Sequence, residues 1–175
     1  KIDPTLFINS SELFVNPYRL DPYKKGLSVK TLEDPRWARC DIKAVTLLSN
    51  IMALQQAKIE LKEEVIFLLD GKVTEGAASN VFLVSGNSVV TPPVSNHILS
   101  GVTRNYVIKL LKFQNIPLLE EELNFKDLYG ADEVWMTSST KEIQPVRKVD
   151  DKVLKLVEPK NSVWFKVLSS FLSLS

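Results

Sequence analysis

The sequence predicts a single domain of the mixed α/β class, and three observations lead to this. The chain has 175 residues, of which 45% are hydrophobic and 25% charged, as in one ordinary globular domain with a buried core. Short apolar runs of strand length alternate with longer segments whose apolar residues recur at helical spacing. No internal repeat, low-complexity run or interdomain linker breaks this alternation.

The first third of the chain predicts strands and one helix. Apolar runs within residues 5–15 predict strand material around a turn, and residues 16–26, with two prolines and a glycine, predict a surface connection. Residues 27–32 alternate as a half-buried strand does. Residues 40–43 predict a strand end, which leads into an amphipathic helix over residues 44–61.

The middle of the chain predicts a meander of short strands and a second helix. The apolar run at residues 65–69 is typical of a strand buried on both faces, and Asp70-Gly71 follows as a turn. Residues 73–91 predict further strands with a turn at residues 85–87. Residues 98–103 lead into a helix, which Ser100 or Thr103 would cap and whose apolar stripe holds Tyr106, Val107, Leu110 and Leu111.

The last third predicts two helices around more strands. Residues 125–129 predict a short helix that Gly130 ends. Residues 133–137 predict a strand, residues 143–153 a final hairpin, and residues 163–172 a closing helix.

Composition narrows the classes of partner. The single cysteine, Cys40, excludes an intramolecular disulfide framework and favours a reducing cytoplasm. The single histidine, His97, argues against a metal site built from several histidines. A formal net charge of +1 without a long basic run disfavours nucleic acid and anionic membranes. The sequence shows no signal peptide and no apolar stretch of membrane-spanning length, so small polar molecules are the expected partners.

Lys43 is a candidate Schiff-base lysine. An amine attacks a carbonyl only when it is unprotonated, which requires burial or a neighbouring cation. Lys43 enters the apolar segment of residues 44–61, where a surface lysine would be unusual. Taken alone, the pattern is more typical of a lysine at the start of an ordinary amphipathic helix.

Two other segments are candidate anion sites. Gly101-Val102-Thr103 opens a predicted helix, whose first backbone N–H groups have no helical partner and bind phosphate well. Ser138 and Ser139 follow a predicted strand and could close on the same anion. Each segment alone also fits a turn in which hydroxyls bond to the local backbone.

Glu75 is a candidate partner for a protonated ring nitrogen. The small residues at positions 76–79 would let a flat ligand lie close to the backbone beside it. Alone, Glu75 also fits a turn glutamate that faces water. A lysine, a carboxylate and two anion sites are, however, the parts that hold pyridoxal phosphate.

Four motifs carry a family resemblance. They are RWARCDIK at residues 36–43, VTEGAASNVF at 73–82, ILSGVTR at 98–104 and TSSTKEIQPV at 137–146. In this order they resemble the motifs of the class IV aminotransferases, the fold-type IV pyridoxal phosphate enzymes, and most of all D-amino acid aminotransferase. The resemblance covers about residues 21–150. It implies an α/β fold, the large C-terminal domain of that class, which is a mixed-sheet pseudo-barrel flanked by helices.

The resemblance also implies site residues. Lys43 would form the Schiff base and move the proton between the substrate Cα and the cofactor, and Glu75 would pair with the pyridine nitrogen, with Arg36 near it. The other implied cofactor contacts are Val102, Thr103 and Ser139 at the phosphate, Ala78, Ser79 and Leu99 along the ring, and Ser138. The chain has Ala77 and Ala78 where relatives often have serine, and Ser139 where threonine is common.

The implied function is transamination of D-amino acids, D-alanine with 2-oxoglutarate, by a cytoplasmic homodimer. Branched-chain aminotransferase, aminodeoxychorismate lyase and a non-catalytic truncated fragment are the alternatives. Residues 1–20 would end a preceding part and connect the domains, and residues 21–175 would form the cofactor-binding C-terminal domain. The N-terminal domain that selects the substrate would be absent from this chain.

Overall fold

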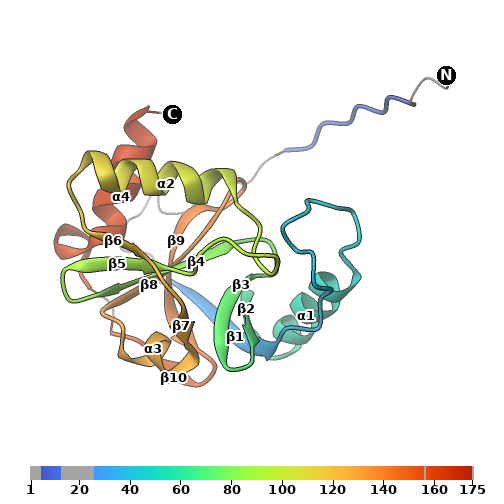
Figure 1. Ribbon diagram of the computed structural model, residues 1–175, viewed down its shortest axis with the longest axis horizontal. Helices are drawn as coiled ribbons and strands as arrows, with labels where there is room; N and C mark the ends of the chain where they lie inside the picture. The colour runs from blue at the N-terminus through green and yellow to red at the C-terminus, as the bar shows by residue number, and fades with distance from the viewer. Residues whose placement is uncertain (1–4, 13–25, 156, 175) are drawn as a thin grey trace.

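A computed structural model describes residues 5–12, 26–155 and 157–174 of the chain. Within them, ten strands form one sheet in the order β6-β5-β4-β8-β9-β1-β2-β3-β7, with β10 paired to β9 (Figure 1). The strands are β1 Leu27–Glu33, β2 Glu64–Leu69, β3 Lys72–Gly76, β4 Asn80–Ser85, β5 Ser88–Thr91, β6 Leu118–Glu120, β7 Leu123–Asn124, β8 Glu133–Ser138, β9 Glu142–Val149 and β10 Lys152–Val153. The helices are α1 Leu48–Ile59, α2 Val102–Phe113, α3 Phe125–Gly130 and α4 Val163–Leu174, and a 3₁₀ turn, η2, spans Pro159–Asn161.

The sheet is mixed, as an α/β fold of this class requires. At its centre β1 runs parallel to both β2 and β9. The hairpins β2–β3, β4–β5 and β8–β9 are antiparallel. In the first hairpin Asp70 and Gly71 both have positive φ, 52° and 75°, as a tight two-residue turn needs. The predicted fold class and this predicted turn are confirmed.

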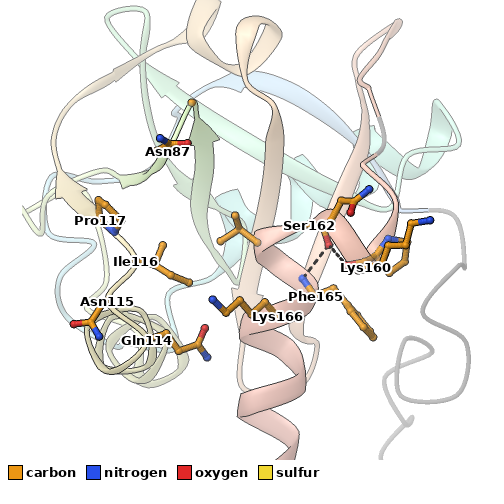
Figure 2. A pocket seen from close by; sticks show the side chains of 13 residues that line it. Asn87, Gln114, Asn115, Ile116, Pro117, Lys160, Ser162, Phe165 and Lys166 are labelled. Atoms are coloured by element: carbon orange, nitrogen blue, oxygen red, sulfur yellow. Dashed lines mark hydrogen bonds between the residues drawn. The ribbon is translucent and has the colours of Figure 1, made fainter.

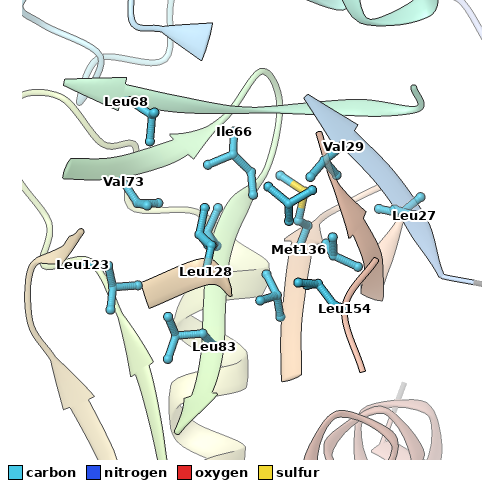
Figure 3. Close-up of a cluster of buried hydrophobic side chains, with 14 of the residues drawn as sticks. Leu27, Val29, Ile66, Leu68, Val73, Leu83, Leu123, Leu128, Met136 and Leu154 are labelled. Atoms are coloured by element: carbon cyan, nitrogen blue, oxygen red, sulfur yellow. The ribbon is translucent and has the colours of Figure 1, made fainter. Parts of the chain in front are cut away.

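Alternation along the strands divides the apolar side chains between two faces of the sheet. On β4, Val81 and Leu83 join a cluster inside the curled sheet, while Phe82 and Val84 pack outward under α2 and α4. Figure 3 shows the inner cluster, to which α3 contributes Leu128. Figure 1 shows α2 and α4 on the same side of the sheet. The period of two in the sequence thus sets both cores.

A third, smaller cluster lies under α1. Val65 and Phe67 of β2 point toward Ala53 and Ala57 of this helix, and Ala77 joins them. The fully buried residues of α1 are these two alanines, and Leu54 of the same helix packs against the cluster. This packing matters for the site, since the segment with Lys43 leads directly into α1.

The prediction for the helix after Lys43 is wrong at its start. α1 begins at Leu48, and residues 44–47 have no helical structure. Val45 and Thr46 are β-branched and disfavour a helix start, and the Leu47 N–H bonds the Val45 carbonyl at 2.8 Å. The predicted apolar stripe is also mostly exposed, with Val45 95% accessible and Leu48 71%.

Three other predictions near the N-terminal half need correction. Residues 5–12 form no strand, and residues 13–25, with the rest of the predicted strand and most of the predicted connection, lie outside the described residues. Residues 40–43 form a turn and a bend instead of a strand end. The predicted meander is interrupted, because β3 pairs with β2 and β7 while β4 pairs with β5 and β8. The strands and helices predicted from residue 98 onward are confirmed within a few residues.

Candidate functional site

The four motif segments contact one another at one end of the sheet. The register of β4 and β8 pairs Asn80 with Thr137, so the turn after β3 lies beside the turn after β8. The N–H groups of Cys40 and Asp41 bond the carbonyl of Asn96 at 2.7 and 3.3 Å. The segment before α1 therefore lies along the loop that leads to α2.

Glu75 occupies the centre of this region and is buried at the end of β3. Its Oε1 accepts a hydrogen bond from Nη1 of Arg36 at 2.6 Å. Its Oε2 accepts from Nδ2 of Asn80 at 3.1 Å and from the backbone N–H of Leu99 at 3.0 Å. Glu75 thus joins the segment after β1, the start of β4 and the loop before α2.

Arg36 is held by groups on every side. Asp34 accepts from its Nε at 2.8 Å and its Nη2 at 2.7 Å, a bidentate pair. Nη2 also donates to the His97 carbonyl at 3.2 Å, and the guanidinium lies 4.5 Å from the centre of the Phe67 ring. Arg36 is therefore a fixed cation under Glu75, as the resemblance implied by placing it near this carboxylate.

Burial sets the electrostatics of this cluster. Burial raises the pKa of Glu75 from 4.5 to about 7, although hydrogen bonding and attraction from Arg36 oppose the shift. Asp34 adds a like charge that raises it further. Burial acts to lower the pKa of Arg36, but the two carboxylates together hold it above its ordinary value. Because Asp34 and Glu75 share the single cation Arg36, the ion pair of Glu75 with Arg36 does not cancel the effect of burial, and the pKa of Glu75 stays raised.

The start of α2 is packed tightly against this cluster. A Cβ atom on Gly101 would overlap Oδ1 of Asn80. Nδ2 of the same Asn80 side chain donates to the Leu99 carbonyl at 2.9 Å. The predicted caps are wrong, because neither Ser100 nor Thr103 caps α2 and the N-cap residue is Gly101. Among the described residues, no side chain accepts a hydrogen bond from the first backbone N–H groups of this helix. Val102 is exposed and Thr103 buried. The free N–H groups of α2 are available to an anion.

The turn between β3 and β4 is also compact. A Cβ on Gly76 would overlap Oγ of Ser79 and crowd Met136. Nδ2 of Asn50, in the first turn of α1, donates to the Ala77 carbonyl at 2.7 Å. Ser79 is buried and Ala78 exposed, so a ligand above this turn would meet a methyl group and backbone.

The turn between β8 and β9 holds the two predicted serines and a lysine that pairs with the buried Glu64. Oγ of Ser138 accepts from the N–H of Lys141 at 3.0 Å, and Ser139 is exposed. Nζ of Lys141 donates to the buried Glu64 at 2.9 Å, and Ser79 lies 3.5 Å from the same carboxylate oxygen. The ion pair ties the serine turn to β2 and to the turn after β3.

Lys43 lies seven residues after Arg36 and is not bonded to any of the groups described above. It is exposed, in an irregular segment five residues before α1. Within the described part of the chain its Nζ has no hydrogen-bond or ion-pair partner, so the burial expected for a reactive lysine is not present here. The structure therefore joins Arg36, Glu75 and Leu99 directly, and leaves the Lys43 side chain exposed.

Sequence reasoning missed four residues of this region. Asp34 lies in a proline-containing break, where a charged side chain predicts solvent. Glu64 begins a strand, and Lys141 lies in a turn, so the sequence predicted no ion pair between them. Asn80, which directly follows the small residues, was the one with a usable signal, because an amide beside a glycine-rich turn often bonds the backbone.

Cavities do not mark the site. A cavity of about 570 Å³ lies between the end of α2 and the start of α4 and is lined by Gln114, Ile116 and Lys166, among others (Figure 2). A second, of about 320 Å³, is lined by Arg36, Trp37, Thr46, Leu48 and Ser49. Of these two cavities, the second touches the Glu75 cluster through Arg36.

No group of three or more metal-ligating side chains occurs among residues 5–12, 26–155 and 157–174. In the same residues, no helix combines the length and apolar character that crossing a membrane requires.

The family model for class IV aminotransferases ("Amino-transferase class IV") matches residues 1–149. A D-alanine aminotransferase from Bacillus licheniformis is 40% identical over 131 residues, which are 75% of this chain and 46% of that protein. The chain belongs to the class IV aminotransferases. It spans about half the length of the curated relatives it matches.

Solved structures agree with this family. A branched-chain aminotransferase from Thermoproteus uzoniensis, with norvaline, superposes with a TM-score of 0.76 at 30% identity, over 86% of this chain and 51% of that one. The PLP-bound form of a hypothetical aminotransferase from Mycobacterium tuberculosis has a TM-score of 0.77 at 24% identity, over 83% of this chain and 55% of that one. The second likeness concerns the fold alone.

Proposed function

We propose that this chain is the cofactor-binding part of a pyridoxal phosphate-dependent aminotransferase and that Lys43 forms the covalent link. The observation that carries the proposal is the buried Glu75 carboxylate, hydrogen bonded to the loop that opens an uncapped helix. A ring nitrogen at Glu75 and a phosphate at α2 would thus be held by neighbouring groups.

The groups present fit this cofactor. An ionised carboxylate offers about four acceptor positions, of which three are used in Glu75, so one remains for a ring N–H. The amides of Val102 and Thr103, the Thr103 hydroxyl and the hydroxyls of Ser138 and Ser139 are the proposed phosphate ligands. Ala78, Ser79 and Leu99 are the proposed ring contacts.

When bound, pyridoxal phosphate supplies an electron sink for the electrons of the substrate Cα–H bond. The residues of this chain hold it and move the proton. Glu75 keeps a positive charge on the ring nitrogen, since a buried carboxylate favours a cation beside it. Lys43 would supply the amine that holds the carbonyl carbon of the cofactor and, once the amine of the substrate has displaced it, would take the proton from the substrate Cα. Because Lys43 is exposed here, covering of its segment by other parts of the enzyme is part of the proposal.

For the substrate, we propose D-amino acids, D-alanine with 2-oxoglutarate as the acceptor. Support comes from curated relatives named D-alanine aminotransferase at 35–40% identity. A branched-chain substrate is the second candidate, because the Thermoproteus uzoniensis neighbour carries that name at 30% identity. We further propose that residues 21–175 are the C-terminal domain of a cytoplasmic homodimer, that residues 1–20 connect it to a preceding part, and that a substrate-selecting domain outside these residues completes the site.

The experiment is to compare wild type, Lys43→Ala and Lys58→Ala after addition of pyridoxal phosphate. Lys58 is an exposed lysine in the last turn of α1 and serves as the matched control. Wild type and Lys58→Ala should gain the absorbance band of a lysine-linked cofactor, and Lys43→Ala should not. A full-length protein that transaminates normally with Lys43→Ala would refute the proposal, and rates with D-alanine and L-leucine decide between the substrates.

A further inference from the structure

The cluster around Glu75 carries an unbalanced charge. The side chains of Asp34, Arg36 and Glu75 are 3%, 6% and 6% exposed and are linked by ion pairs of 2.7 and 2.6 Å. Two carboxylates and one guanidinium leave a net charge of −1. A buried cluster of this kind is stabilised by one more cation, and without it one carboxylate tends to take up a proton.

The two carboxylates are not equivalent. Asp34 accepts from Nε and Nη2 on one edge of the guanidinium, and it also accepts the Arg36 backbone N–H at 3.0 Å and the Thr74 hydroxyl at 3.3 Å. Glu75 receives only one guanidinium N–H, on Oε1. Arg36 is therefore neutralised mainly by Asp34, and the excess negative charge belongs to Glu75.

Counting acceptor positions shows where a cation would bind. Oε2 of Glu75 has two donors, Asn80 and Leu99, and is filled. Oε1 has a single donor, Arg36, and keeps one lone pair. A new N–H donor can bond only at Oε1, where it shares the oxygen with Arg36.

Building on the proposed function, we propose that Asp34 is a positioning residue for the cofactor ring: it offsets the charge of Arg36, so that the cluster of Asp34, Arg36 and Glu75 keeps a net charge of −1 and favours a proton on a ring nitrogen bound at Oε1 of Glu75. Asp34 acts through Arg36 and needs no contact with the cofactor. Without Asp34, the Arg36–Glu75 pair would be neutral overall and would no longer favour a cationic ring.

Other groups near Glu75 do not provide this charge. Asn80 and the Leu99 amide are neutral donors, and His97 contributes its backbone carbonyl to Arg36. Cys40 is the remaining titratable group coupled to the cluster, and burial raises the pKa of its thiol, which keeps it neutral. A substitution of Asp34 therefore changes the charge of the cluster and leaves the Glu75 side chain in place.

The test follows the Glu75 carboxyl by ¹³C NMR in the cofactor-free chain, with the resonance assigned by its loss in Glu75→Gln. The wild-type midpoint is expected at pH about 7. Asp34→Asn should lower the midpoint by roughly one unit or more, and Arg36→Gln should raise it, since the two variants change the local charge in opposite directions. Asp34→Glu should keep it near wild type. Asp41→Asn, which breaks the exposed Arg39–Asp41 pair, is the matched control and should not shift it.

The second arm adds pyridoxal phosphate labelled with ¹⁵N in the ring. Asp34→Asn should reduce the protonated fraction of the ring nitrogen, and Asp34→Glu should restore it. A Glu75 midpoint that Asp34→Asn leaves unchanged, or that both charge variants move in the same direction, would overturn the role of Asp34. If either Asp34→Asn or Arg36→Gln fails to fold, the direction in which the other variant shifts the Glu75 midpoint decides whether Asp34 has this role. Failure of wild type to take up pyridoxal phosphate would refute the proposed function instead, and the titration would still judge the charge of the cluster.

Discussion

Replacing Glu75 by glutamine should change how the stability of the cofactor-free chain depends on pH. Burial raises the pKa of Glu75 from 4.5 to about 7 in the folded chain. A raised pKa means that the folded state binds the proton more tightly than the unfolded state does. The stabilisation is therefore complete at a pH below the pKa of Glu75 in the unfolded chain, and it is lost as the pH rises through the pKa of Glu75 in the folded chain.

The magnitude follows from the two pKa values. A difference of about 2.5 units at about 1.36 kcal/mol each corresponds to about 3 kcal/mol in full, and about 2.5 kcal/mol of it is lost between pH 5 and pH 8. Glu75→Gln has no proton to lose and removes this term. Its own cost, from the altered Arg36 contact, is the same at both pH values.

The assay is urea unfolding at pH 5 and pH 8, followed by tryptophan fluorescence. Relative to wild type, Glu75→Gln should gain about 2.5 kcal/mol between pH 5 and pH 8. Glu122→Gln, which alters the exposed pair of Lys72 and Glu122 at 2.7 Å, is the control and should stay within about 0.5 kcal/mol at both. A stability difference between Glu75→Gln and wild type that does not change with pH would refute the reasoning.

Three other substitutions test the packing of the site and of the helices around it. Gly101→Ala should lower the free energy of unfolding by about 1–3 kcal/mol and weaken pyridoxal phosphate binding, because its Cβ overlaps Asn80. The control is Gly130→Ala, whose Cβ meets nothing within 4 Å and which should change neither the unfolding free energy nor the binding. The carboxylate of Glu133 accepts the backbone N–H groups of Val163 and Trp164 at 2.7 and 2.9 Å, so Glu133→Ala should lower the free energy of unfolding by about 1–2 kcal/mol and speed hydrogen exchange at the start of α4. The control Glu158→Ala removes one partner of an exposed ion pair and should change neither. Lys141→Met should cost about 1–2 kcal/mol in urea unfolding because it deprives the buried Glu64 of its cation, and equal stability of Lys141→Met and the exposed control Lys72→Met would contradict this.

The strands were predictable because a single local rule governs them. A short run of mostly apolar residues is typical of a strand buried on both faces, so residues 65–69 and 133–137 gave strands close to β2 and β8. The Asp70-Gly71 turn was predictable for the same local reason, since its conformation needs positive φ. The site motifs were predictable as a set, because their order along the chain carried the family resemblance.

The surroundings of Lys43 were not predictable from periodicity. Helical spacing of apolar residues indicates burial only when another surface covers them, and Val45 and Leu48 are exposed in the described chain. The buried Asp34–Arg36 pair was hidden for the opposite reason. Charged residues near Pro35 normally indicate solvent, and only the fold places Phe67, Glu75 and His97 around the guanidinium.

The central claim is that Lys43 forms the covalent link to the cofactor, and one measurement tests it directly. The chain is incubated with pyridoxal phosphate, reduced with borohydride, digested and mapped by mass spectrometry. The account predicts that the phosphopyridoxyl group is found on the peptide with Lys43 and that Glu75→Gln lowers its yield. Labelling spread over exposed lysines such as Lys58 and Lys72, with no preference for Lys43, would contradict it.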